Sequence, residues 1–243
     1  MNIAVIGMGY VGLVSSACFA ELGHNVIGMD NNLSKIQTLR EGRIPIYERR
    51  LPELFQKRLG SRLTFTASLA QAVQASDVIF VAVGTPPATS GDADLCCVDD
   101  VVSVMADHIT SPKLVVEKST VPVRTCDAIR RTMELRGVPP PFLFVASNPE
   151  FLKEGTAVSD FLNPDRIVLG VDDDFSERLL REIYAPLWEG HYYRSENLDH
   201  HIETPLPQLV VTSTRSAELI KYASNAFLAM KNLLHQRDGE RCT

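Results

Sequence analysis

The segment NIAVIGMGYVG at residues 2–12 joins a short apolar run to three glycines spaced G-x-G-x-x-G. Ile3–Ile6 is apolar throughout, which is typical of a strand buried on both faces of a parallel sheet. The chain after the glycines is expected to be helical to about Leu22, where Gly23 ends the helix. A strand, a glycine turn and a helix in this order predict a phosphate-binding turn at the helix N-terminus.

A second predicted strand, Asn25–Met29, ends at Asp30, 18 residues after Gly12. A carboxylate at this place would hold the ribose hydroxyls of a dinucleotide and repel a 2′-phosphate, which favours NAD over NADP. Gly7 would permit the tight turn, Gly9 the approach of the pyrophosphate and Gly12 the close packing of helix on strand. The alternative is a glycine-rich turn followed by Asp30 as an ordinary helix cap.

Apolar runs alternate with helical patterns along the rest of the chain. Further strands are expected at 63–66, 77–83, 114–118, 142–146, 166–171 and 209–211. Helices are expected at about 31–39, 51–59, 98–108, 123–135, 175–187 and 216–234. This alternation predicts an α/β fold, a doubly wound parallel sheet of Rossmann type with helices on both faces, followed by the start of a long helix. Residues 188–207 lack periodicity and are expected to form a surface loop.

Composition excludes several classes of protein. The charge sum is 24 − 30 = −6, which disfavours binding to a nucleic-acid backbone. The sequence contains no run of 18 or more apolar residues, so no membrane span is predicted. The N-terminus also lacks the basic region of a signal peptide. A cytoplasmic enzyme is therefore expected. The five cysteines, which include Cys242, show neither disulfide nor zinc spacing. Buried or idle thiols without a chemical role are expected at Cys18, Cys96, Cys97 and Cys126. His191, His200, His201 and Glu203 are close in sequence, but a polar surface loop is favoured over a metal site, so none is expected.

Polar turns follow three of the later predicted strands, at 83–87, 118–122 and 147–150. Each has an ordinary explanation, because Gly and Pro end strands and Ser or Thr caps helices. Ligands of open parallel sheets bind outside the carboxyl ends of the strands, so three such turns at one edge favour a binding site.

Two pairs of polar residues are four positions apart. Glu150 and Glu154 would face one side if their stretch were helical, and could position a substrate hydroxyl or a water; an exposed pair beside a helix start is the alternative. Lys221 and Asn225 lie in the predicted long helix. A lysine on an apolar face is a candidate desolvated amine that stabilises an oxyanion, with the Asn amide donating a further hydrogen bond. An exposed lysine and a tolerated surface asparagine are the alternative.

These residues together resemble the NAD-dependent UDP-glucose 6-dehydrogenases, within the UDP-glucose/GDP-mannose dehydrogenases, from Met1 to about Lys231. The segments that carry the resemblance are IAVIGMGYVGLV, VGTPP, EKSTVP, SNPEFLKEGTAVSDFLNPDRIVLG and SAELIKYASNAFLAMK.

The resemblance implies the roles of individual residues. The NAD site is expected to include Gly7, Gly9, Tyr10, Val11, Gly12, Asp30, Lys35, Gly84, Thr85, Pro86, Ser119, Thr120 and Glu154. The UDP-sugar is expected to contact Glu150, Phe151, Leu152, Lys153, Glu154, Lys221 and Asn225. Glu150 would be the acid–base residue that helps water attack a thioester, Lys221 and Asn225 would stabilise an oxyanion, and Thr120 is counted with these catalytic residues.

Members of such a family oxidise the sugar C6 alcohol to a carboxylate in two hydride transfers, the second through a thioester on a cysteine. That cysteine belongs to a GGxCxPKD-like loop, which this sequence lacks, and Cys242 does not match it. The chain is therefore expected to be the cofactor half of the enzyme and inactive by itself. A smaller departure is Pro45–Arg50, where the family often has Pro-Gly after Glu48.

The expected organisation is an NAD-binding domain at 1–207, a last strand and the start of a central dimerisation helix at 208–234, and a truncated or frame-shifted tail at 235–243, with the C-terminal UDP-binding domain absent. Members of the family form homodimers or larger assemblies, so Leu219, Ala223 and Phe227 are expected to be exposed in this chain. Two alternatives remain: a non-catalytic NAD-binding module, and a dehydrogenase of the 3-hydroxyacid or 6-phosphogluconate type, which also uses a helical Lys-x-x-x-Asn.

Overall fold

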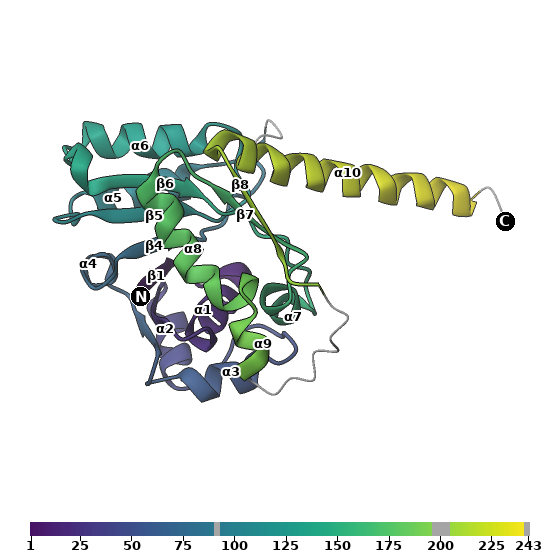
Figure 1. The fold of residues 1–243 in the computed structure, drawn as a ribbon, viewed down its shortest axis with the longest axis horizontal. Helices are drawn as coiled ribbons and strands as arrows, with labels where there is room; N and C mark the ends of the chain where they lie inside the picture. The colour runs from purple at the N-terminus through teal and green to yellow at the C-terminus, as the bar shows by residue number, and fades with distance from the viewer. Residues whose placement is uncertain (90–92, 196–204, 241–243) are drawn as a thin grey trace.

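A computed structural model of the chain describes residues 1–89, 93–195 and 205–240 (Figure 1). Eight strands form one sheet in the order β3-β2-β1-β4-β5-β6-β7-β8. The strands are β1 Asn2–Ile6, β2 Asn25–Met29, β3 Leu63–Thr66, β4 Val78–Val81, β5 Lys113–Glu117, β6 Leu143–Ser147, β7 Arg166–Gly170 and β8 Gln208–Thr212. The helices are α1 Tyr10–Glu21, α2 Leu33–Arg40, α3 Leu51–Arg58, α4 Leu69–Gln74, α5 Cys96–Ala106, α6 Thr125–Leu135, α7 Ala157–Leu162, α8 Asp174–Trp188, α9 His191–Ser195 and α10 Thr214–Glu240.

Two hydrophobic clusters cover the two faces of the sheet. Successive residues of a strand point to opposite faces, and the central strands are apolar at nearly every position, so they supply both clusters. In β1, Ile3 and Val5 pack with α1, α3, α7 and α8, whereas Ala4 and Ile6 pack with α4, α5 and α6. The predicted α/β sheet with helices on both faces is confirmed.

One pairing in the sheet departs from the prediction. Strand β7 runs antiparallel to β6, and the two meet only at Ser147 and Gly170; β8 then pairs with β7 in parallel. The predicted all-parallel sheet is wrong at this point, because no full crossover helix separates β6 from β7. As a consequence, residues 148–156 stay beyond the carboxyl edge of the sheet, and the short helix α7 then packs against α1.

The main elements lie within a few residues of their predicted positions, but the short helices α4, α7 and α9 were not predicted, nor was the 3-10 turn Pro140–Phe142. A helix of five or six residues is too short to show a periodic pattern. Helix α9 lies inside the predicted loop at 188–207, where Tyr192 is buried against the core, so that prediction is wrong for 191–195. His200, His201 and Glu203 lie outside the described residues.

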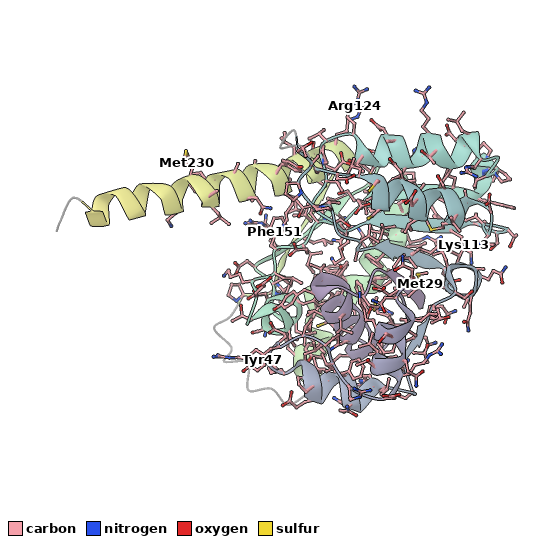
Figure 2. All side chains as sticks on the ribbon, turned by 180° about the vertical axis from the view of Figure 1, so that it is seen from behind. Met29, Tyr47, Lys113, Arg124, Phe151 and Met230 are labelled. Carbon is pink, nitrogen blue, oxygen red and sulfur yellow. The ribbon has the colours of Figure 1, made fainter. Side chains whose placement is uncertain are left out.

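Helix α10 starts on the sheet and then leaves it (Figure 1). Its first turn packs on β7 so closely that a Cβ on Gly170 would lie 2.5 Å from the Cβ of Ala217. Further along, the helix projects away from the body, and Figure 2 shows Met230 on this projecting part. In the described part of the chain, no helix combines the length and apolar character needed to cross a membrane.

Candidate active site

The glycine turn after β1 has the geometry that a dinucleotide phosphate requires. Gly7 has φ +97°, and a Cβ there would lie 2.7 Å from the carbonyl oxygen of Ala82. A Cβ on Gly12 would lie 1.8 Å from the carbonyl oxygen of Gly7, so α1 approaches the turn closely only because residue 12 is glycine. A Cβ on Gly9 would meet no atom within 4 Å, so this position opens onto free space at the start of α1. The adjoining Val11 is half-buried in the first turn of α1.

Asp30 lies at the end of β2 beside this turn and is 7% exposed. Its carboxylate accepts hydrogen bonds from the backbone N–H of Met8 (2.9 Å) and Asn32 (2.9 Å) and from Lys35 Nζ (2.6 Å). Burial would raise the pKa of Asp30, but these three donors outweigh it and hold the pKa below its ordinary value. The helix cap at this point is instead Asn32, whose side chain accepts from Lys35 N (3.0 Å).

Two further turns line the same carboxyl edge. Thr85 Oγ1 donates to the carbonyl of Thr120 (2.9 Å), and Ser119 Oγ donates to the carbonyl of Val83 (2.9 Å). These bonds hold the turn after β4, which includes Gly84 and Pro86, against the turn after β5. The structure therefore brings the predicted residues 84–86, 119 and 120 together beyond neighbouring strands.

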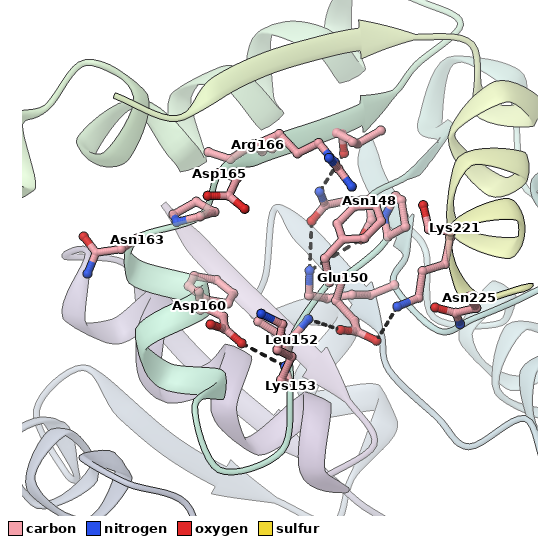
Figure 3. A pocket seen from close by; sticks show the side chains of 18 of the residues that line it. Asn148, Glu150, Leu152, Lys153, Asp160, Asn163, Asp165, Arg166, Lys221 and Asn225 are labelled. Carbon is pink, nitrogen blue, oxygen red and sulfur yellow. Dashed lines mark hydrogen bonds and ion pairs between the residues drawn. The ribbon is translucent and has the colours of Figure 1, made fainter. Parts of the chain in front are cut away.

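A cavity of about 410 Å³ lies beyond the ends of β6 and β7 (Figure 3). Glu150 enters it from the turn after β6, and Lys221 enters it from α10, 71 residues later. Lys221 Nζ lies 3.1 Å from Glu150 Oε1, and both side chains are nearly buried, with 8% and 12% of their surface exposed. The alternative interpretation of Lys221 as an exposed surface lysine is therefore wrong. Asn225, one turn further along α10, lines the same cavity.

Residues 151–153 are not helical, so Glu150 and Glu154 do not face one side of a helix, as their spacing would have required. The Glu150 carboxylate instead accepts a hydrogen bond from the backbone N–H of Leu152, two residues later (2.6 Å). Glu154 is exposed, and it is not among the residues that line the cavity. Lys153 lines the cavity, and its N–H donates to Asp160 Oδ2 (2.9 Å).

The aromatic ring of Phe151 is close to two cations in this cavity. The guanidinium carbon of Arg166 is 5.0 Å from the ring centroid, and Lys221 Nζ is 5.3 Å from it. Cations above an aromatic face are attracted by its quadrupole, so Phe151 helps to keep Lys221 in place. Arg166 was not predicted as a site residue, because only the fold brings it to Phe151.

Lys118 is a second site residue that sequence reasoning missed. It is 3% exposed, lines the cavity, and donates to Asn148 Oδ1 (3.0 Å), which also accepts from Tyr184 Oη (2.5 Å). Asn148 Nδ2 donates in turn to the carbonyl of Val168 (2.9 Å). Burial lowers the pKa of Lys118 to about 8. The only signal in the sequence was its position at a strand end in EKSTVP.

The four described cysteines are free thiols, and none lines the cavity: Cys18 and Cys126 are buried elsewhere, and Cys96 and Cys97 are exposed. Cys242 lies outside the described residues. In the ranges that the structure describes, no group of three or more His, Cys, Asp or Glu side chains is placed to hold a metal ion.

Comparison with known proteins decides the family. The family model described as "UDP-glucose/GDP-mannose dehydrogenase family, NAD binding domain" matches residues 1–188. The chain belongs to this family. It carries the family's NAD-binding domain, and the open Gly9, the close approach at Gly12 and the carboxylate of Asp30 fit that cofactor.

Curated relatives and solved structures agree with this placement. The chain is 46% identical over 233 residues to a UDP-glucose 6-dehydrogenase of Rickettsia felis, covering 95% of this chain and 48% of the relative. A UDP-glucose dehydrogenase from Pyrobaculum islandicum is similar in structure, with a TM-score of 0.83 and 41% identity over 95% of this chain and 50% of that one. A GDP-mannose dehydrogenase from Pseudomonas aeruginosa has the same TM-score at 34% identity, over 95% of this chain and 50% of that one. The chain therefore spans about half the length of the relatives it matches.

A 3-hydroxyisobutyrate dehydrogenase from Mycobacterium tuberculosis shares the fold more distantly, with a TM-score of 0.57 and 15% identity over 96% of this chain. This likeness concerns the fold alone. It does not favour the alternative of a 3-hydroxyacid dehydrogenase.

Replacing Asp30 with asparagine is expected to weaken NAD binding about ten-fold and to narrow the preference for NAD over NADP. The carboxylate accepts from two backbone N–H groups and Lys35. An amide would lose the charge-assisted bond and the repulsion of a 2′-phosphate. Titration calorimetry with both cofactors measures the ratio. The control is Asp107→Asn, because Asp107 is an exposed aspartate. If Asp30→Asn left the ratio of the Kd values for NAD and NADP unchanged, the role of Asp30 in selecting NAD would be contradicted.

Proposed function

We propose that the chain supplies the cofactor site and part of the sugar site of an NAD-dependent dehydrogenase that oxidises the C6 alcohol of UDP-glucose to the carboxylate of UDP-glucuronate. The observation that carries this proposal is the nearly buried pair of Glu150 and Lys221, 3.1 Å apart, in a cavity at the same sheet edge as the glycine turn. The relatives named UDP-glucose 6-dehydrogenase support the choice of substrate.

The two side chains suit the two charges that alcohol oxidation creates. NAD held by the glycine turn and Asp30 would supply the hydride acceptor for the C6–H bond. A carboxylate such as Glu150 takes up or returns the accompanying proton, directly or through a water. An ammonium held in a nearly buried site stabilises an oxyanion, which is the role proposed for Lys221, with the Asn225 amide as a further donor. Phe151, Leu152 and Lys153 would contact the nucleotide sugar from the turn after β6.

Thr120 and Glu154 are proposed to act from the cofactor side. The carbonyl of Thr120 accepts from Thr85 Oγ1 (2.9 Å), which supports a place for this turn at the proposed cofactor site. Glu154 is exposed beyond the end of β6, next to Gly155, whose N–H contacts the glycine-turn residue Tyr10 (3.0 Å). Both residues would therefore line the boundary between NAD and the sugar.

We further propose that this chain does not complete the reaction by itself. The second oxidation proceeds through a thioester, which requires a thiol beside the sugar. None of the four described cysteines lines the cavity. The proposed organisation keeps an NAD-binding domain at 1–207 and a last strand and central helix from 208. The free thiols are compatible with the reducing conditions of the cytoplasm, where we propose that the chain is located.

Titration calorimetry tests the proposal. The chain is expected to bind NAD, and to bind UDP-glucose weakly or not at all when NAD is present, because only part of the sugar site is on this chain. The control is UDP-glucose titrated into Lys221→Met, which removes the ammonium from the cavity. Absence of NAD binding in the wild-type chain would refute the cofactor assignment, and tight UDP-glucose binding would refute the view that the sugar site is incomplete.

The projecting part of α10 leads to a prediction about association. The residues Leu219, Phe227, Leu228 and Met230 are each more than half exposed, and Ala223 is also exposed, as predicted. Clustered apolar surface of this kind favours association, and we propose a second copy of the chain as the partner. Light scattering at micromolar concentration is expected to show dimers or larger species. The double variant Phe227→Ser/Leu228→Ser should shift the chain toward monomer, whereas a monodisperse wild-type monomer would contradict the prediction.

A further inference from the structure

Glu48 is a buried carboxylate that the proposed function does not use. It is 2% exposed and lies in the loop between α2 and α3. Its backbone is held in a tight turn, in which Leu51 N donates to the carbonyl of Glu48 (3.4 Å). Arg50 in this turn has φ +65°, a left-handed conformation that normally favours glycine. The loop thus contains a turn at Glu48–Leu51 although its sequence departs from the Pro-Gly pattern of the family.

Helix α3 attaches this turn firmly to α1, the helix that begins at the glycine turn. Phe55 of α3 is completely buried in the core. Lys57 Nζ and Arg58 Nε donate to the two carboxylate oxygens of Glu21 in α1, at 2.8 and 2.7 Å. Glu48 thus has a fixed position relative to the cofactor turn.

The Glu48 carboxylate contacts two segments that are far apart in sequence. Oε2 accepts a hydrogen bond from the hydroxyl of Tyr10, in the glycine turn, and from the N–H of Gly155 (2.8 Å). The N–H of Gly155 also lies 3.0 Å from the Tyr10 oxygen, so the three groups form a closed triangle. Oε1 has no hydrogen-bond partner among the described residues. Burial, together with the Glu48 contact, raises the pKa of Tyr10 to about 12, so the phenol is protonated and can donate across the neutral and mildly alkaline range.

A buried carboxylate with one unpaired oxygen costs free energy, so hydrophobic packing alone would favour an apolar residue in this place. Both partners of Glu48 belong to the candidate site. Tyr10 begins α1, and Gly155 ends the segment that starts with Glu150. The free-energy cost of burying the Glu48 carboxylate is therefore offset by the hydrogen bonds that align these two segments.

We propose that Glu48 is a positioning residue that ties residues 150–155 to the cofactor turn, so that NAD binding and the order of this segment are coupled. The inference rests on the proposed function for the role of Glu150 and Glu154. It requires a hydrogen-bond acceptor at the position of Oε2 but no negative charge. Glutamine in this place would keep both hydrogen bonds through its carbonyl oxygen, whereas leucine would lose both.

Hydrogen exchange of the 243-residue chain, measured by mass spectrometry with and without NAD, tests this inference. In the wild type, NAD is expected to slow exchange in peptides covering 149–156. In Glu48→Leu, exchange at Gly155 should be about ten-fold faster, the effect of NAD on this segment should be lost, and the Kd for NAD should rise about three-fold. Glu48→Gln should behave as the wild type. The controls are Glu53→Gln, an exposed glutamate of α3, and Tyr47→Phe, an exposed tyrosine of the same loop (Figure 2).

The outcomes separate the inference from the proposed function. Absence of NAD binding in the wild type refutes the cofactor site. NAD binding with the same exchange response in Glu48→Leu and wild type refutes the role of Glu48, and a Glu48→Gln variant that behaves as Glu48→Leu refutes the role of the acceptor. Should Glu48→Leu fail to fold, Tyr10→Phe takes its place: it removes one side of the triangle and should weaken the response, whereas a response equal to that of Glu48→Gln overturns the inference.

Discussion

Replacing Gly12 with alanine is expected to abolish NAD binding and to lower the free energy of unfolding by about 3 kcal/mol or more. The new Cβ would lie 1.8 Å from the carbonyl oxygen of Gly7, and 3.5 Å from the Cβ of Ala82. Neither side can move easily, because Gly7 N donates to the carbonyl of Met29 (2.8 Å) and the turn is held between β1 and α1. Urea unfolding and titration with NAD measure the two effects.

Gly9→Ala is the matched control for this prediction. A Cβ on Gly9 would meet no atom within 4 Å, and its backbone has φ −79°, which alanine adopts freely. Stability is expected to change by about 1 kcal/mol at most, while NAD binding should weaken because the pyrophosphate approaches the backbone here. A Gly12→Ala variant as stable as Gly9→Ala would show that α1 does not pack on the turn as described.

The second large effect is a dependence of stability on pH that Glu117→Gln should remove. Glu117 ends β5 and is 1% exposed; its Oε1 accepts from Ser119 N (2.7 Å), and Oε2 has no partner among the described residues. Burial raises the pKa of Glu117 to about 8, with the nearby carboxylate of Glu218 adding to the shift and the Ser119 hydrogen bonds opposing it. The side chain is therefore protonated in the folded chain at neutral pH and ionised in the unfolded one.

The sign of the effect follows from the proton balance. Between about pH 4.5 and pH 8 the folded state binds the extra proton, so stability falls as pH rises through this range. The total loss is about 3–5 kcal/mol. Glu117→Gln should match the wild type near pH 5 and exceed it by several kcal/mol near pH 8.5 in urea unfolding. Exposed Glu134 supplies the control Glu134→Gln. Parallel stability curves for wild type and Glu117→Gln would contradict the prediction.

Lys118, the neighbour of Glu117, contributes to the pH dependence of stability at higher pH. Its pKa is lowered to about 8 by burial, so the unfolded chain binds more protons than the folded chain between about pH 8 and pH 10.5. Stability from this group rises with pH across that range. The combined contribution of these two adjacent residues to stability is therefore smallest near pH 8.

The cofactor turn could be predicted from the sequence because its determinants are local. A strand, three glycines, a helix and an acid at the next strand end all lie within Asn2–Asp30, and each has a backbone requirement visible in the residue itself. The same holds for the main strands and helices, whose apolar periodicity reflects burial on one or both sides. The exposed apolar residues of α10 were also predicted, since their helical spacing is a property of the segment alone.

Contacts between distant segments were decided by the fold. Glu150 and Lys221 are 71 residues apart, and no rule of sequence spacing relates them. They meet because β7 runs antiparallel to β6, and because β8, which pairs with β7, leads into α10 near the end of β6. The burial of Lys118 and the triangle of Tyr10, Glu48 and Gly155 have the same origin. Residue types and local periodicity specify the elements and the phosphate turn, whereas desolvation and pairing of charges depend on which segments pack together, a property of the whole chain.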